Sequence, residues 1–71
     1  MNNTTKEFKK FIKSLRDERI KQGKTQQSIA KKAKISQSTV NFYERGLIEP
    51  TVTNFIKWTK ELGYKVIITK E

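Results

Sequence analysis

The sequence contains no cysteine and no histidine among its 71 residues. The absence of cysteine excludes disulfide bonds and thiolate metal sites, and it is compatible with a reducing compartment. Without histidine the chain lacks the commonest general base and a common transition-metal ligand. The acidic residues do not compensate, because Asp17 and Glu18 are adjacent and diverge on a helix, and the others are scattered. We therefore expect no catalysis, no bound metal and no cofactor.

Long apolar runs are also missing. No run approaches the roughly 18 residues that span a bilayer, and the N-terminal segment MNNTTKEF lacks the apolar centre of a signal peptide. These absences predict a cytoplasmic protein without a membrane segment. A basic amphipathic helix on a membrane surface is the alternative, but the segments that follow the first helix also need an apolar face for packing.

Positive charge is abundant. Lysine and arginine number 16 against seven acidic residues, so the formal net charge is +9. This excess favours a polyanionic partner, although solubility alone is the alternative explanation. The length predicts one domain over residues 1–71, and a domain of this size buries only about 60% of its unfolded surface. Association with a second copy would therefore help its stability.

Residues 25–45 predict two short helices joined by a tight turn. Thr25 and Ser36 are suitable N-cap residues, and apolar residues follow each of them at helical spacing. These apolar residues are Ile29, Ala30 and Ala33 in the first helix, and Val40 and Tyr43 in the second. The remaining side chains of the second helix are mostly amides and hydroxyls, which can form hydrogen bonds to base edges.

This segment resembles the helix-turn-helix of the lambda-repressor-like, or Xre, family of phage repressors. The matching positions are Gln26 at the start of the first helix, Ala30 at the helix crossing, Ile35 in the turn and Val40 in the second helix. The resemblance covers about residues 6–62, including the ordered segments LRDERIKQGKTQQ, SQSTV, YERG and EPT. One position departs from the family: Lys34 stands where glycine is usual, and a left-handed turn costs such a residue roughly 1 kcal/mol.

The resemblance implies a protein that binds double-stranded DNA through the second helix. The family pattern assigns base reading to Gln37, Ser38 and Asn41, and Phe42 projects to the same side, where it could contact thymine methyl groups or pack partly in the core. The residues expected at the phosphate backbone are Lys24, Gln26, Lys34, Ser36, Thr39 and Arg45. Gln26 is further expected to brace Gln37. The resemblance also implies a structural ion pair between Arg19 and Glu44, with two solvated charges as the alternative.

Other helices are expected on both sides of this segment. A first helix should run from Thr5 to Gly23, and a fourth should begin at a Thr51 or Thr53 cap and stop at Gly63. The predicted apolar face of the first helix consists of Phe8, Phe11, Ile12, Leu15 and Ile20. That of the fourth consists of Val52, Phe55, Ile56, Trp58, Thr59 and Leu62. Between them, Gly46 should cap the third helix, and Leu47 or Ile48 should reach the core.

The C-terminal segment YKVIITKE has a different character. Its β-branched residues predict a strand over residues 64–69, and no other segment shows strand character. The strand would therefore pair with its copy in a second chain, as in the HipB-type antitoxins that it resembles, unless it forms a short fifth helix. The expected dimer interface comprises Trp58, Tyr64, Val66, Ile67 and Ile68. Trp58 could instead be a core residue.

Together these observations predict an all-α, lambda-repressor-like bundle of four to five helices with a helix-turn-helix at residues 25–45. A C-terminal β-strand at residues 64–69 would pair in a dimer. The expected function is a homodimeric transcriptional repressor or regulator that reads an inverted-repeat operator through the major groove. The alternative is the antitoxin of a toxin–antitoxin pair, whose main partner is a protein and whose DNA binding is autoregulatory. No small-molecule substrate is expected in either case.

Overall fold

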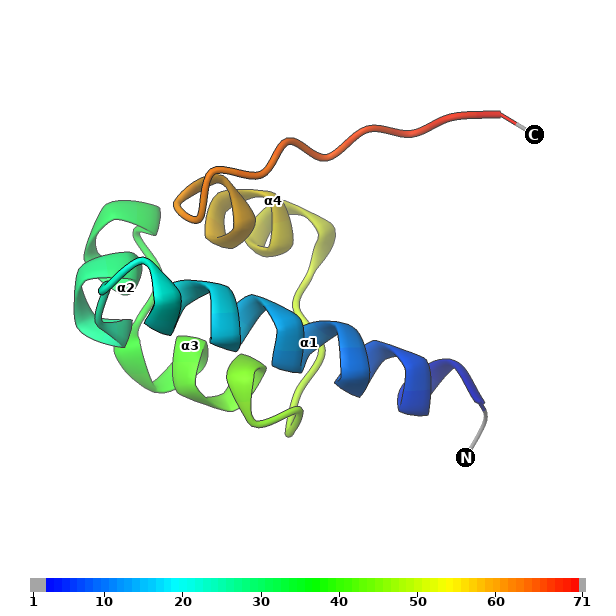
Figure 1. Ribbon diagram of the computed structural model, residues 1–71, viewed down its shortest axis with the longest axis horizontal. Coiled ribbons are helices and arrows are strands. Elements are labelled where there is room, and N and C mark those ends of the chain that lie inside the picture. The colour runs from blue at the N-terminus through cyan, green and yellow to red at the C-terminus, as the bar shows by residue number, and fades with distance from the viewer. Residues whose placement is uncertain (1–2, 71) are drawn as a thin grey trace.

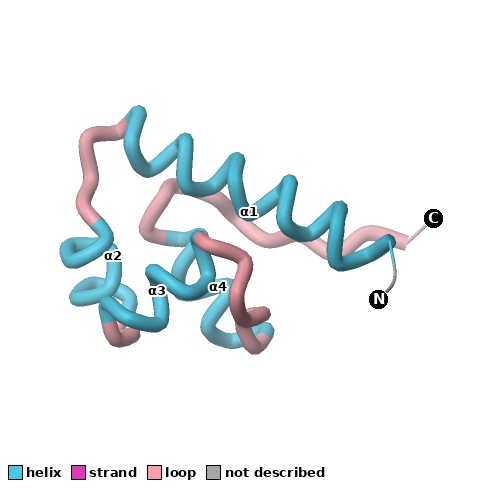
Figure 2. Tube along the Cα trace, turned by 90° about the horizontal axis from the view of Figure 1, so that it is seen from below, coloured by secondary structure: helices cyan, strands magenta, loops and turns pink. Residues whose placement is uncertain are grey.

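The computed structural model describes the backbone of residues 3–70 and the side chains of residues 6–70. Within these residues the chain forms four helices, which Figure 1 shows in order. They are α1 (Asn3–Lys21), α2 (Gln26–Ala33), α3 (Gln37–Glu44) and α4 (Val52–Lys60). The long helix α1 extends beside the three short ones, and the segment after α4 runs back toward the N-terminal end of α1 (Figures 1 and 2). The predicted helical bundle is thus confirmed.

The three short helices begin at hydroxyl caps. The side chains of Thr25, Ser36 and Thr51 accept hydrogen bonds from backbone amides in the first turns of α2, α3 and α4. Each bond satisfies one of the amides that a helix leaves without an internal partner. The predicted caps are therefore confirmed, with Thr51 rather than Thr53 starting α4.

All four helices end at a residue with left-handed backbone. The chain has three glycines, and each occupies one of these positions: Gly23 (φ 72°), Gly46 (φ 69°) and Gly63 (φ 89°). The fourth position, after α2, belongs to Lys34, at φ 59°. After Lys34 the amide of Ile35 donates to the carbonyl of Ala30 over 3.0 Å, and the same pattern closes the other three helices. The lysine thus takes a left-handed conformation that usually favours glycine.

One apolar core joins the four helices. Its buried members are Ile12, Leu15, Ile29, Ala30, Val40, Tyr43, Trp58 and Leu62. The predicted face of α1 was too wide, because Phe11 and Ile20 are about half exposed. They lie on either side of the narrower stripe that Phe8, Ile12 and Leu15 form.

Three further expectations for the second half of the chain are wrong. Leu47 and Ile48 both stay exposed, since the loop between α3 and α4 passes over the surface. Val52 and Ile56 of α4 are exposed as well, whereas Trp58 and Thr59 of the same helix are buried. Trp58 has no exposed surface and stacks against Tyr43 with ring centroids 5.3 Å apart. It is a core residue, so its assignment to a dimer interface is wrong.

The segment after α4, residues 64–70, which we call the tail, has no helix and no strand. The expected strand at residues 64–69 and the alternative fifth helix are therefore both absent from the described residues. A strand needs a neighbouring strand for its backbone hydrogen bonds, and the rest of the described chain consists of helices and loops. Among the described residues, no helix has both the length and the apolar character to span a bilayer.

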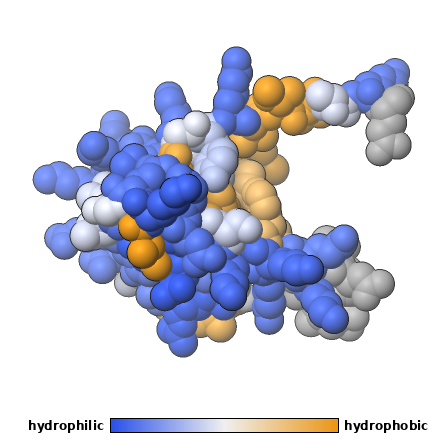
Figure 3. Space-filling model, viewed as in Figure 1, coloured by the Kyte–Doolittle hydropathy of each residue, from blue (hydrophilic) through white to orange (hydrophobic). Residues whose placement is uncertain are grey.

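The tail, α1 and α4 line an apolar groove of about 290 Å³, the tail groove. Its apolar lining comprises Phe11, Leu15, Phe55, Tyr64, Val66 and Ile67. Figure 3 shows apolar side chains along the tail and in the recess beside it, whereas polar side chains cover most of the remaining visible surface. Ile67 is 70% exposed and Ile68 is 94% exposed. The tail and the groove beside it thus form one exposed apolar patch.

Candidate nucleic-acid interface

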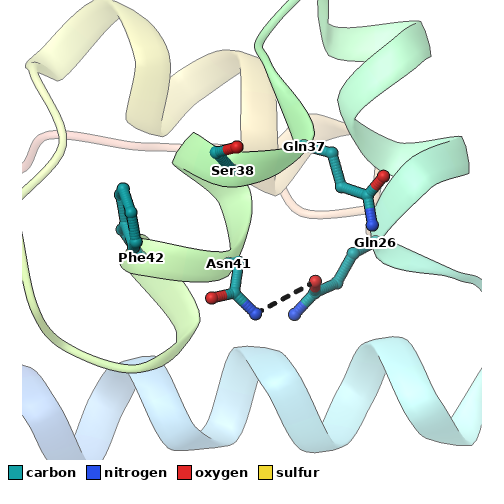
Figure 4. Close-up of a pocket in the computed structure, with 5 residues that line it drawn as sticks. All are labelled: Gln26, Gln37, Ser38, Asn41 and Phe42. Carbon is teal, nitrogen blue, oxygen red and sulfur yellow. Dashed lines mark hydrogen bonds between the residues drawn. The ribbon is translucent and has the colours of Figure 1, made fainter.

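A polar hollow of about 280 Å³ lies on the outer side of α3, at its junction with the start of α2. Five side chains line it (Figure 4). They are Gln26 from α2, and Gln37, Ser38, Asn41 and Phe42 from α3. All four residues predicted to read bases therefore share one surface with the glutamine that starts α2.

The packing of α3 turns these residues outward. Val40 is fully buried and Tyr43 nearly so, and both contact the core on the inner side of the helix. Ala30 is buried as well, and its small side chain permits close approach of α2 and α3. Gln37 and Ser38, which occupy the first turn of α3, are consequently exposed. Phe42 is also exposed and forms an aromatic edge of the hollow (Figure 4).

Arg19 and Glu44 form an ion pair behind this surface. The guanidinium donates from Nε to Glu44 Oε2 over 2.7 Å and from Nη2 to Oε1 over 3.1 Å. Its Nη1 donates to the carbonyl oxygen of Lys24 over 2.7 Å. The two side chains are only 12% and 1% exposed, so they are not solvated surface charges. The pair joins α1 to the end of α3.

Gln26 extends this network to the hollow. Its Nε2 donates to Glu44 Oε1 over 2.9 Å, and its Oε1 accepts from Asn41 Nδ2 over 3.2 Å (Figure 4). The expected hydrogen bond to Gln37 is not among the contacts of the described residues. The expectation is wrong because the two ends of the Gln26 amide are hydrogen-bonded to Glu44 and Asn41, which lie in the second half of α3. Gln26 therefore braces Asn41 rather than Gln37.

Comparison with known proteins agrees with this geometry. A protein-family model, described as helix-turn-helix, matches residues 15–67, which is more than half of the chain. The chain belongs to the Xre/lambda-repressor-like helix-turn-helix family. Members of this family are DNA-binding regulators and are typically not enzymes, so family membership supports binding to double-stranded DNA. No curated protein and no solved structure matches the chain.

The helix-turn-helix has basic residues at its edges. Lys34 in the turn and Arg45 after α3 are exposed. Lys24 is directed elsewhere, since its Nζ donates to the carbonyl of Glu61 beyond α4 over 2.8 Å. Ser36 and Thr39 are the two hydroxyl residues expected at phosphates. The Ser36 hydroxyl accepts a hydrogen bond from the Thr39 backbone amide, and the two side-chain hydroxyls are hydrogen-bonded to each other over 2.6 Å. Ser36 thus serves as a cap, and Lys34 and Arg45 are the freer cations.

A second cluster of basic residues was missed in the sequence. Lys57 and Lys60 of α4 line a shallow depression together with Lys32 and Lys34 of the helix-turn-helix. More than 20 residues separate the two pairs, so no local pattern in the sequence could indicate their proximity. Among the described residues, no group of acidic side chains, histidines or cysteines could hold a metal ion.

Proposed function

We propose that this chain is a homodimeric transcriptional regulator, a repressor, that reads a specific duplex sequence with the exposed side of α3. The observation that carries the proposal is the polar hollow, in which Gln26, Gln37, Ser38, Asn41 and Phe42 converge. An α-helix fits the major groove, where each base pair has its own pattern of donors, acceptors and methyl groups. Amide, hydroxyl and aromatic side chains are suited to such a surface.

Within the hollow each side chain has a role that follows from its chemistry. Gln37, at the first turn of α3, is exposed and can bond adenine through its amide, while Ser38 can bond a base edge or a phosphate. Phe42 can contact a thymine methyl group. Gln26 retains one N–H that is not used by Glu44, and this group can donate to a phosphate.

The charge of the chain supports strong attraction to the phosphate backbone. With a net charge of +9 and exposed cations at Lys34 and Arg45, each subunit could neutralise several phosphates. If four are neutralised per subunit, the dimer should show a log–log slope of affinity against salt of about −7. A slope near zero would remove the electrostatic part of the proposal.

The tail groove supports association of two copies. Tyr64, Val66, Ile67 and Ile68 leave apolar surface in contact with water, and their extended backbone has no partner strand in the described chain. Antiparallel pairing of two tails would satisfy that backbone and cover the groove by two-fold symmetry. The two α3 helices would then enter successive major grooves about 34 Å apart, on an inverted repeat.

Selection of bound sites from random duplexes, at physiological salt, tests the proposal. We expect an enriched inverted repeat whose half-sites lie about one helical turn apart, and a two-to-one complex of protein and duplex. Failure to enrich any sequence would contradict specific binding. Enrichment of a single half-site, bound by one subunit, would contradict the dimer but not specific binding.

The exposed tail also favours a second candidate, in which the chain is an antitoxin and the tail groove binds a toxin protein. Apolar patches of this kind mark interaction sites, and the partner need not be a second copy. DNA binding would then be autoregulatory. Copurification of one distinct polypeptide encoded beside this chain would support the antitoxin, and its absence would favour the stand-alone regulator.

A further inference from the structure

We propose that Asn41 is a specificity-determining residue for adenine, because Glu44, acting through Gln26, fixes the orientation of its side-chain amide. This inference rests on the proposed DNA-binding function, and it goes further by assigning one base to one residue. It depends on three consecutive points: the buried Glu44 carboxylate orients Gln26, Gln26 orients Asn41, and Asn41 then presents fixed groups to a base.

The first step is the acceptor-only character of Glu44. Its carboxylate is 1% exposed and pairs with Arg19, so it offers oxygen lone pairs and no hydrogen. Arg19 donates two hydrogen bonds to it, and Gln26 Nε2 donates a third over 2.9 Å. A Gln26 amide turned the other way would place its carbonyl oxygen against this carboxylate, which is repulsive and leaves a buried acceptor without a donor.

The second step passes this orientation to α3. Because the nitrogen of Gln26 faces Glu44, its Oε1 faces Asn41 and requires a donor. Asn41 supplies Nδ2 over 3.2 Å, and it could not supply Oδ1 without opposing two oxygens. Side-chain amides can ordinarily present either end to a partner. Here the fixed charge of Glu44 selects one end for both amides.

The third step concerns what Asn41 still offers to DNA. After the bond to Gln26 it retains Oδ1 and one N–H, and Figure 4 shows Oδ1 on the side turned away from Gln26. Adenine presents a donor at N6 beside an acceptor at N7, which complement these two groups. Guanine presents acceptors at both O6 and N7, so Oδ1 would oppose O6. A freely rotating amide could avoid that clash, and a fixed one cannot.

Gln37 provides the contrast within the same hollow. It is exposed, and in the described part of the chain its side chain makes no hydrogen bond. Its amide is free to turn toward either purine. We therefore expect stricter selection of adenine by Asn41 than by Gln37, although both are primary amides.

The experiment compares duplex preferences of the full chain and its variants. The base pair read by Asn41 is the one at which Asn41→Ala loses selectivity, and there the wild-type chain should prefer adenine over guanine by about five- to 150-fold. Gln26→Met keeps the length of the side chain and removes the amide. In this variant the preference should fall below about three-fold at that base pair and persist at the others. Gln37→Ala is the matched control, since it should alter a different base pair.

Two results would overturn the inference while leaving DNA binding intact. One is a wild-type preference for guanine, or no preference, at the base pair read by Asn41. The other is an unchanged adenine preference in Gln26→Met. If no duplex is selected at all, the proposed function fails first, and NMR of the free protein then decides. Hydrogen exchange of the Asn41 side-chain amide should be slower than that of Gln37, and equal exchange would refute the fixed orientation.

Discussion

The outer surface of α3 and the tail differ in how far contacts within one copy of the chain satisfy their polar groups and bury their apolar groups. Behind α3, the carboxylate of Glu44 accepts three hydrogen bonds and is 1% exposed. In the tail, Ile68 is 94% exposed, and the backbone forms neither helix nor strand. The outer surface of α3 is thus organised by contacts within the chain, whereas the tail presents exposed apolar groups.

This difference follows from the two kinds of interaction involved. Hydrogen bonds between buried polar groups are directional, so they fix side-chain orientation once both partners lie in the same chain. Apolar burial has no such direction and depends on the area removed from water. We therefore expect changes behind α3 to alter stability and base preference, and changes in the tail to alter association.

The largest effect should come from the ion pair. Arg19→Ala leaves the carboxylate of Glu44 buried without its cation, and such a loss costs about 3–5 kcal/mol in the free energy of unfolding. Urea denaturation measures this loss in the free energy of unfolding. Arg16→Ala is the control, because Arg16 and Asp17 lie 4.0 Å apart with both side chains at least half exposed. The control should lose less than about 1 kcal/mol, and equal losses would contradict the structural role of the network.

The next effect should appear in the tail. Ile67→Asp places a charge where two tails would meet, and because each subunit loses one isoleucine side chain, dimerisation should weaken by about 1.5–3 kcal/mol per subunit. Sedimentation equilibrium measures the dissociation constant, and circular dichroism should show unchanged helix content. The control is Lys70→Gln, outside the tail groove, which should leave dimerisation unchanged. A dimer that tolerates Ile67→Asp would show that the tails do not pair.

A smaller effect should appear on the outer surface of α3. Gln37→Ala should cost about 1–3 kcal/mol of binding free energy on the selected duplex and relax the preference at one base pair. Unfolding stability should stay unchanged, since Gln37 is exposed. Fluorescence anisotropy with duplexes substituted at single positions measures both affinity and selectivity. Equal weakening on all duplexes would instead identify Gln37 as a phosphate contact.

The smallest effect concerns the turn that sets α3 against α2. Lys34→Gly should raise the free energy of unfolding by up to about 1 kcal/mol, because glycine adopts the left-handed conformation without a steric penalty. The matched variant is Gly23→Ala, where an added Cβ meets no atom within 4 Å, so only the backbone conformation is tested. It should lower stability by about 1 kcal/mol. Stabilities that do not move in opposite directions would contradict this reading of the two turns.

Local features of the fold were predictable from the sequence. Thr25, Ser36 and Thr51 cap their helices through groups only three residues away, and Gly46 and Gly63 end helices by their own conformational freedom. Such features depend on neighbouring residues alone. The arrangement of α3 was also predictable, because its apolar and polar residues separate at helical spacing.

Features that depend on distant contacts were less predictable. Gln26 could have braced Gln37, and only the position of Glu44 in space directs it to Asn41. The tail has a β-branched composition, but a strand requires a partner that the described chain does not contain. Phe11 and Ile20 are apolar, yet both are about half exposed. The spacing of apolar residues along α1 did not show how wide a face of this helix would be buried.

Titration of the selected duplex into the isotope-labelled full chain, followed by NMR, locates the surface that contacts DNA. We predict the largest changes in chemical shift at residues 26, 37, 38, 41 and 42, around the hollow, with smaller changes at residues 66–68 of the tail. The opposite pattern, with large changes in the tail and none on the outer side of α3, would contradict the account.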